Sequence, residues 1–124
     1  MIQVSEGDFD RAVEAALKSI PAEFRPYLDN VIIEVRDKPD LSLLEECEET
    51  DDLLGLYVGV PLEDKGPEQA AVPLPDRILI FRENLCAMCD TRADLIDEIR
   101  ITVLHEVGHH FGMDEDRLAE FGYD

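Results

Sequence analysis

The sequence predicts a single domain of mixed α and β structure, and three observations support this prediction. The chain has 124 residues, enough for one hydrophobic core but too few for two, so residues 1–124 are expected to form one domain. Three short apolar stretches have the length and composition of strands, and the first of them is rich in the β-branched residues that strands favour. Two longer stretches, one toward each end of the chain, repeat their apolar residues at the helical spacing of three and four positions.

The first predicted element is a helix over residues 8–20. Asp8 is the expected N-cap, because a short polar side chain there can accept a hydrogen bond from the first turn. Pro21 is expected to end the helix, since proline disrupts a continuing helical backbone. Residues 21–30 then connect this helix to the first predicted strand, residues 31–36, which consists mainly of valine and isoleucine.

An acidic segment follows over residues 45–52, where six of the eight side chains are carboxylates. Carboxylates bind hard cations, so a metal site is one reading of the segment. However, the segment lacks the spaced ligands and the turn glycine of a calcium-binding loop. We therefore expect a solvated acidic loop or a short helix.

Two further strands are predicted on either side of a loop. Residues 54–61 form the second strand, and its glycines permit bends or close approach of a neighbour. Residues 62–75 contain several prolines and a glycine, which is typical of an exposed loop. Residues 77–82 form the third strand. Its short length and charged ends favour a place at the edge of the sheet.

The longest predicted helix begins near Arg92, has Thr91 as its N-cap, and ends at Gly112. At about 100° per residue, six of its apolar side chains fall within a sector of roughly 160°, which we expect to face the core. These residues are Leu95, Ile96, Ile99, Val103, Val107 and Phe111.

This helix carries an HExxH motif, from His105 to His109, which is a signature of helical zinc peptidases. The two histidines lie about 40° apart, on the side of the helix away from the apolar sector described above, which we call the core stripe. Both imidazoles can therefore reach one metal ion. Glu106 lies at the border of the stripe and can take a proton from metal-bound water. His110 falls within the stripe, so we expect it in the core or behind the ligands.

A catalytic zinc ion usually has three protein ligands and one water molecule. In the extended zincin pattern, a glycine follows the second histidine by three residues and the third ligand follows by six. Gly112 is in register, and Glu115 occupies the ligand position. Asp114 and Asp116 are the alternatives, because the turn can differ by one residue, and Glu120 is a more distant candidate. We expect one of these carboxylates to complete the site.

The cysteines and the net charge limit the classes of function. Cys86 and Cys89 form a CxxC pair, but a zinc knuckle needs a second ligand pair, so buried small side chains are expected, with a disulfide or metal site as the alternative. The net charge of −19 disfavours nucleic acid and anionic membranes as partners. An odd cysteine count and the absence of a signal-peptide pattern indicate a cytoplasmic protein.

Most of the chain resembles a known family, the short bacterial zincin-like metallopeptidases of the minimal zincin type. The resemblance lies in residues 19–23, 30–35, 54–62, 74–82 and 102–118. It implies a small α+β zincin-like domain, in which a short mixed β-sheet packs against the HExxH helix and an N-terminal helix.

The resemblance also implies a function, the hydrolysis of peptide bonds by zinc-activated water. It implies zinc on His105 and His109, with Glu106 as the general base. In zincins an edge strand beside the active-site helix pairs with extended substrate, and residues 77–81 are the expected strand. The sequence lacks a methionine turn and a C-terminal subdomain, so one wall of the usual cleft is expected to be absent or to come from a partner protein. The alternative function is a non-catalytic metal-binding or interaction module that retains the site.

Overall fold

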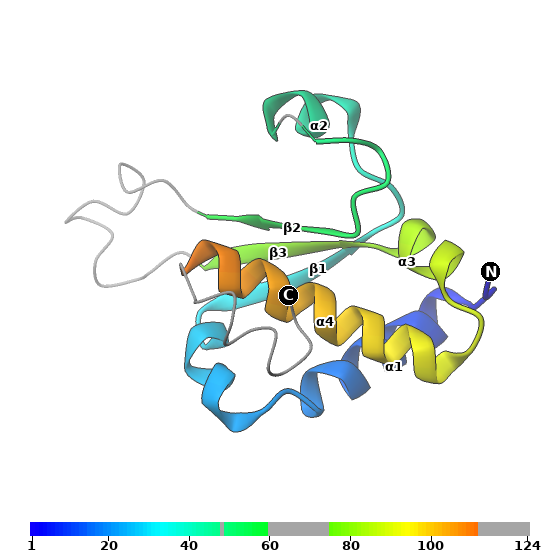
Figure 1. Cartoon of the computed structure of the whole chain (residues 1–124), viewed down its shortest axis with the longest axis horizontal. Coiled ribbons are helices and arrows are strands. Elements are labelled where there is room, and N and C mark those ends of the chain that lie inside the picture. The colour runs from blue at the N-terminus through cyan, green and yellow to red at the C-terminus, as the bar shows by residue number, and fades with distance from the viewer. Residues whose placement is uncertain (48, 60–74, 112–124) are drawn as a thin grey trace.

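The structure is a computed structural model that describes residues 1–47, 49–59 and 75–111 (Figure 1). Its elements are α1 (Glu6–Lys18), the 3-10 helix η1 (Ala22–Leu28), β1 (Val31–Arg36), α2 (Leu41–Cys47), β2 (Gly55–Val58), β3 (Asp76–Phe81), α3 (Arg82–Met88) and α4 (Arg92–His110). The predicted α+β class is confirmed. None of the described helices is long and apolar enough to cross a membrane.

Both long helices begin at a residue whose hydroxyl caps the first turn. Ser5 caps α1, where its side chain accepts a hydrogen bond of 3.1 Å from the backbone N–H of Asp8. The prediction of Asp8 as the cap was therefore wrong. Asp8 lies instead inside the first turn, where its charge complements the helix dipole. Thr91 caps α4 as predicted, because its hydroxyl accepts from the N–H of Asp94 at 3.1 Å.

The sheet has three strands in the order β1-β3-β2. β1 pairs parallel with β3, and β2 pairs antiparallel with it, so the expected mixed sheet is confirmed. The prediction that residues 77–82 lie at an edge was wrong, because β3 occupies the centre. The four side chains from Ile78 to Phe81 are at most 1% exposed. Such an unbroken apolar run is typical of a strand that is covered on both faces. It is a stronger indication of a central strand than the charged ends are of an edge strand.

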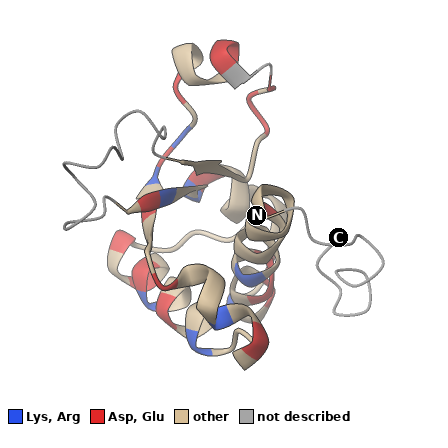
Figure 2. Ribbon diagram, turned by 90° about the vertical axis from the view of Figure 1, so that its left-hand side faces the viewer, with Lys and Arg blue, Asp and Glu red and all other residues tan. Residues whose placement is uncertain are grey.

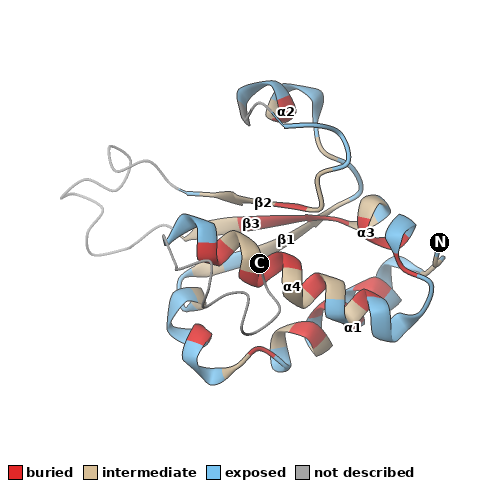
Figure 3. Cartoon of the chain, in the orientation of Figure 1, coloured by how far each residue is buried: buried red, intermediate tan, exposed pale blue. Residues whose placement is uncertain are grey.

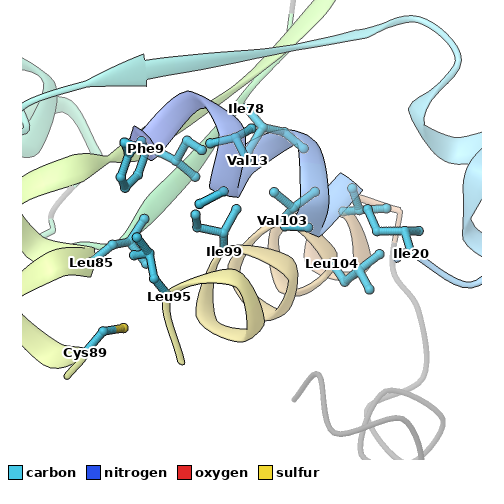
Figure 4. Packing of buried hydrophobic residues seen from close by; sticks show 14 of the residues in the cluster. Phe9, Val13, Ile20, Ile78, Leu85, Cys89, Leu95, Ile99, Val103 and Leu104 are labelled. Atoms are coloured by element: carbon cyan, nitrogen blue, oxygen red, sulfur yellow. The ribbon is translucent and has the colours of Figure 1, made fainter. Parts of the chain in front are cut away.

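The helices α4 and α1 pack against each other on one side of the sheet (Figure 1). Figure 4 shows the contact layer, in which Phe9 and Val13 of α1 lie near Ile99 and Val103 of α4 and near Ile78 of β3. All five side chains are buried. Burying a side chain of this kind stabilises the fold by about 1.5–3 kcal/mol, so this layer holds α4 firmly against the sheet.

The burial along α4 largely follows the predicted core stripe (Figure 3). Leu95, Ile99, Val103 and Val107 are fully buried, and Ile96 is partly buried against the core. Phe111 does not follow the prediction, since it is 46% exposed at the C-terminal end of the helix. Leu104 and Thr102 are buried outside the stripe. The helix has neighbours on several sides, including α1, η1, β2 and β3, and therefore buries more than one face.

The acidic segment forms the end of α2 and the connection to β2. Its described carboxylates are exposed, which confirms the expectation of a solvated loop or short helix. Figure 2 shows acidic residues gathered on this part of the chain, above the sheet. Elsewhere, Cys86 and Cys89 are buried free thiols, in agreement with their expected role as small buried side chains.

Candidate metal centre and active site

The motif residues lie on the last two turns of α4. Their spacing on the helix brings the imidazoles of His105 and His109 together, with ring centroids 4.3 Å apart and planes tilted by 53°. His105 is half-buried and His109 is exposed, so the pair lies where the helix meets solvent. Two adjacent imidazoles suit zinc, which binds neutral histidine nitrogens.

The third ligand of the expected zinc site stays a prediction. Within the described part of the chain, no group of three His, Cys, Asp or Glu residues could hold a metal ion. The candidates Glu115, Asp114, Asp116 and Glu120, and the turn residue Gly112, lie outside the described residues. The donor chemistry of the described part therefore fits two of the three protein ligands that a catalytic zinc ion takes.

Glu106 is half-buried between α4 and the strand β2. Its Oε1 accepts a hydrogen bond of 3.1 Å from the backbone N–H of Tyr57. Burial raises the pKa of the Glu106 carboxyl, while the Tyr57 N–H and the imidazoles of His105 and His109 lower it, and the nearby Glu49 carboxylate raises it further. The net pKa lies above the ordinary value, which suits a group that accepts a proton during catalysis.

The strand β2 presents a backbone edge next to Glu106. Residues opposite each other in an antiparallel pair alternate between hydrogen-bonded and non-hydrogen-bonded positions. The N–H of Phe81 donates to the carbonyl of Leu54 at 3.0 Å, so these two residues form a hydrogen-bonded pair. Because the pattern alternates, the backbone N–H and C=O groups of Gly55 and Tyr57 point away from β3. The bond from the Tyr57 N–H to Glu106 agrees with this direction. No described strand pairs with this outer edge of β2.

His110 lies at the surface. The prediction that it lies in the core was therefore wrong. Its ring stacks on the ring of Tyr57, with centroids 3.8 Å apart and planes 10° from parallel. The Tyr57 hydroxyl donates a hydrogen bond of 2.7 Å to Asp76. Burial and the Asp76 carboxylate both raise the pKa of Tyr57. The helix passes beyond the core at this end, since the neighbouring Phe111 is also exposed.

Tyr57 and Asp76 are site neighbours that the sequence reasoning missed. Both lie in strands, and their contact depends on the register that places Tyr57 opposite Ile78. A register of this kind is set by pairing across the sheet, which no local pattern specifies. A tyrosine in a predicted strand was the only signal, and the core offered an equally good explanation for it.

A cavity of about 420 Å³ opens beside His105 and Glu106. It lies between α4 and the connection from α2 to β2. Its lining also includes three carboxylates and a set of aliphatic or small residues. These are Glu49, Asp52 and Glu98, together with Leu53, Leu54, Gly55, Ile101 and Thr102. The lining of the cavity therefore combines two motif residues with the carboxylates of Glu49, Asp52 and Glu98, which are called the acidic wall below.

Comparisons with known proteins agree with this architecture. The model of a family described as zincin-like metallopeptidase matches residues 28–123, which include the whole sheet and the HExxH helix. No curated protein matches the chain. Among solved structures, a "conserved hypothetical protein" from "Thermo thermophilus" is similar in fold, with a TM-score of 0.54 and 24% sequence identity. The match covers 94% of this chain and 98% of that one.

Proposed function

Because the chain belongs to the zincin-like metallopeptidase family, we propose that it is a zinc-dependent metallopeptidase that hydrolyses peptide bonds in a peptide or protein substrate. One observation carries the proposal. The adjacent imidazoles of His105 and His109 lie on the same helix as the half-buried carboxylate of Glu106, which bonds to a strand edge that no described strand pairs with. A site for peptide hydrolysis needs this combination of ligands, a base and a surface for extended substrate.

His105 and His109 would hold the zinc ion, and a carboxylate of Glu115, Asp114 or Asp116 is the proposed third ligand. Bound zinc lowers the pKa of a coordinated water molecule and polarises the scissile carbonyl. The two imidazoles are already adjacent on a packed helix, so little reorganisation of the described ligands is needed before the ion binds.

Glu106 is the proposed general base. Its carboxylate would take the proton of the attacking water and pass it to the leaving amine. The Tyr57 N–H holds Oε1 and thereby fixes the orientation of the carboxylate relative to the helix. No described residue donates a hydrogen bond to Oε2, which is the oxygen that we assign to proton transfer.

The strand β2 is the proposed docking edge for substrate, in place of residues 77–81. β3 cannot take this role, because it pairs with a strand on each side. The outward-facing backbone of Gly55 and the carbonyl of Tyr57 can instead pair with an extended peptide, while the Tyr57 N–H stays bonded to Glu106. Such pairing would bring the peptide backbone past Glu106.

Purified protein tests the proposal through its zinc content and its cleavage of a mixed peptide library. Glu106→Gln should keep stoichiometric zinc but lose at least about 100-fold in activity, because the proton acceptor is removed. His105→Ala should lose both zinc and activity. Glu14→Gln, which changes an exposed carboxylate on α1, is the control of equal charge change and should retain both.

The outcomes separate the candidate functions. Stoichiometric zinc without cleavage would favour the non-catalytic metal-binding or interaction module. Full activity in Glu106→Gln would contradict the assigned base. A wild-type protein that binds no zinc would contradict both functions. Far-ultraviolet circular dichroism of each variant shows whether a loss arises from unfolding.

A further inference from the structure

The cavity beside Glu106 combines carboxylates with aliphatic surface, and this is the chemistry that binds a long basic side chain. We propose that it selects peptides that carry Lys or Arg close to the bond that is cleaved. The inference rests on the proposed peptidase function, because it names the substrate class of the same site. The volume of about 420 Å³ lies within the range of about 300–1,000 Å³ that small-molecule pockets occupy.

The lining of the cavity matches the two parts of a Lys or Arg side chain. Leu53, Leu54 and Ile101 provide partly buried aliphatic surface for the methylene stem. Glu49 and Glu98 provide carboxylates for the cationic head, as does the neighbouring Asp52. No described Lys or Arg lines the cavity.

The two glutamates are available to a ligand. Among the described residues, neither Glu49 nor Glu98 has an ion-pair partner, whereas Glu34 and Asp97 on other surfaces have arginine partners. A bound Lys or Arg would therefore supply positive charge that the described part of the wall lacks. It would not have to displace a described salt bridge.

The part of the acidic wall that precedes β2 is held in place by a side chain from α3. The Nδ2 of Asn84 donates hydrogen bonds of 2.8 Å to the carbonyls of both Asp51 and Leu53. The N–H of Leu53 also donates to the carbonyl of Thr50 at 3.3 Å, which closes a turn between Glu49 and the strand. These bonds fix the backbone that carries the exposed carboxylates of Glu49 and Asp52.

The outer edge of β2, with which no described strand pairs, links the cavity to the proposed cleavage position. Gly55 lines the cavity, and its backbone faces the outer edge of β2, two residues before Tyr57, whose N–H donates to Glu106. Successive residues of a paired strand lie about 3.4 Å apart. A peptide paired with β2 would thus place one of its side chains at the cavity. That side chain would belong to a residue at most two positions from the peptide residue beside Glu106.

Two peptide series test the proposal on the zinc-loaded protein. Each series varies one position, on either side of the cleaved bond, among Lys, norleucine and Glu. The wild type should cleave the Lys peptide at least about tenfold faster than the norleucine peptide at one of these positions, because norleucine keeps the stem but lacks the charge. The double variant Glu49→Gln/Glu98→Gln should reduce this ratio to below about threefold.

A control of equal charge separates the cavity from the overall acidity of the protein. Asp10→Asn/Glu14→Gln removes two exposed carboxylates from α1, so its net charge matches that of the cavity variant. This control should keep the wild-type ratio. An equal fall of the ratio in both double variants would overturn the proposal, as would a wild type with no preference for Lys.

Binding of the same peptides, labelled with fluorescein, distinguishes a failure of this inference from a failure of the proposed function. If no peptide is cleaved, the peptidase proposal fails, but the cavity should still bind the Lys peptide at least about fivefold more tightly than the norleucine peptide. The cavity variant should lose this difference and the control should keep it. Equal affinities for the Lys and norleucine peptides in the wild type would overturn the inference.

Discussion

The backbone N–H of Tyr57 and the Oε1 of Glu106 are joined by a hydrogen bond of 3.1 Å, although the residues are 49 positions apart in the sequence. The bond connects the edge strand β2 to the proposed catalytic carboxylate on α4. Strand and base therefore have a fixed relative position. Two substitutions in β2, at Tyr57 and Gly55, test which contacts keep β2 in place against α4.

Tyr57→Phe should lower the free energy of unfolding by about 0.5–1.5 kcal/mol, because it removes the hydroxyl that donates to Asp76. The ring stack on His110 and the backbone bond to Glu106 should remain, so cleavage activity should change by less than about twofold. Urea denaturation measures the stability. Tyr27→Phe is the control, since this ring also contacts Phe111, and it should change stability by less than about 0.5 kcal/mol.

Gly55→Ala should destabilise the protein by about 1–3 kcal/mol, because overpacking forces neighbours apart. The added Cβ would lie 2.6 Å from the Cγ2 of Thr102 and 3.0 Å from the carbonyl oxygen of Leu79. The substitution should also separate β2 from α4 and reduce peptide cleavage. Thermal unfolding and activity are the measurements.

The matched control is Gly7→Ala in the first turns of α1. Its Cβ would have Arg11 as its nearest contact, at 3.8 Å, so the alanine has room. Alanine favours the helix over glycine, and stability should rise by up to about 1 kcal/mol. Equal effects of the two substitutions would show that the contact with Thr102 does not decide the position of β2.

Glu34 makes part of the stability dependent on pH. The hydrogen bond from Arg36, at 2.6 Å, holds the pKa of the Glu34 carboxyl below its ordinary value of 4.5, and Arg77 at 3.3 Å adds to this effect. Because the folded pKa lies below that of the unfolded chain, the unfolded state takes up the proton first as the pH falls. This contribution is therefore present above about pH 4.5 and is lost as the pH falls through the folded pKa.

The measurement compares the wild type with Glu34→Gln in urea at several pH values. The wild type should be more stable at pH 7, and the two curves should converge under acid conditions. The gap at pH 7 should narrow in about 1 M salt, because the charges are partly exposed and salt screens them. A gap that persists unchanged in acid would contradict this role of Glu34.

The two buried thiols should react slowly in the folded protein. Burial and the nearby carboxylates of Glu98 and Asp94 raise the pKa of Cys89 to about 11, and burial raises the pKa of Cys86. The thiolate is the reactive form, so alkylation of Cys89 by iodoacetamide at pH 8 should be at least about 100-fold slower in the folded than in the unfolded protein. Peptide mass mapping measures each cysteine separately, and equal rates in both states would contradict the burial of these thiols.

Elements that depend on local signals could be predicted from the sequence. The strand β1 has the predicted bounds of Val31 and Arg36, because its β-branched run ends abruptly on both sides. The cap at Thr91 follows from the chemistry of its hydroxyl. The adjacency of His105 and His109 follows from the helical period alone.

Features that depend on pairing between distant segments could not be predicted in the same way. The central place of β3 requires knowing that β1 joins one side of it and β2 the other. The contact of Tyr57 with Glu106 requires that strand order and its register as well. His110 was misplaced because the helical period continues beyond the point where the core ends.

The packing of α1 against α4 has a consequence for the time at which the protein can fold during synthesis. Phe9 and Val13 need Ile99 and Val103 as partners, and these residues leave the ribosome roughly 5–20 seconds later at ordinary elongation rates. Until then, the apolar face of α1 has no helix to cover it, and chaperones have access to it. Among the described segments, the helix that carries the HExxH motif thus completes the core, so the nascent chain acquires this helix and its stability in the same step.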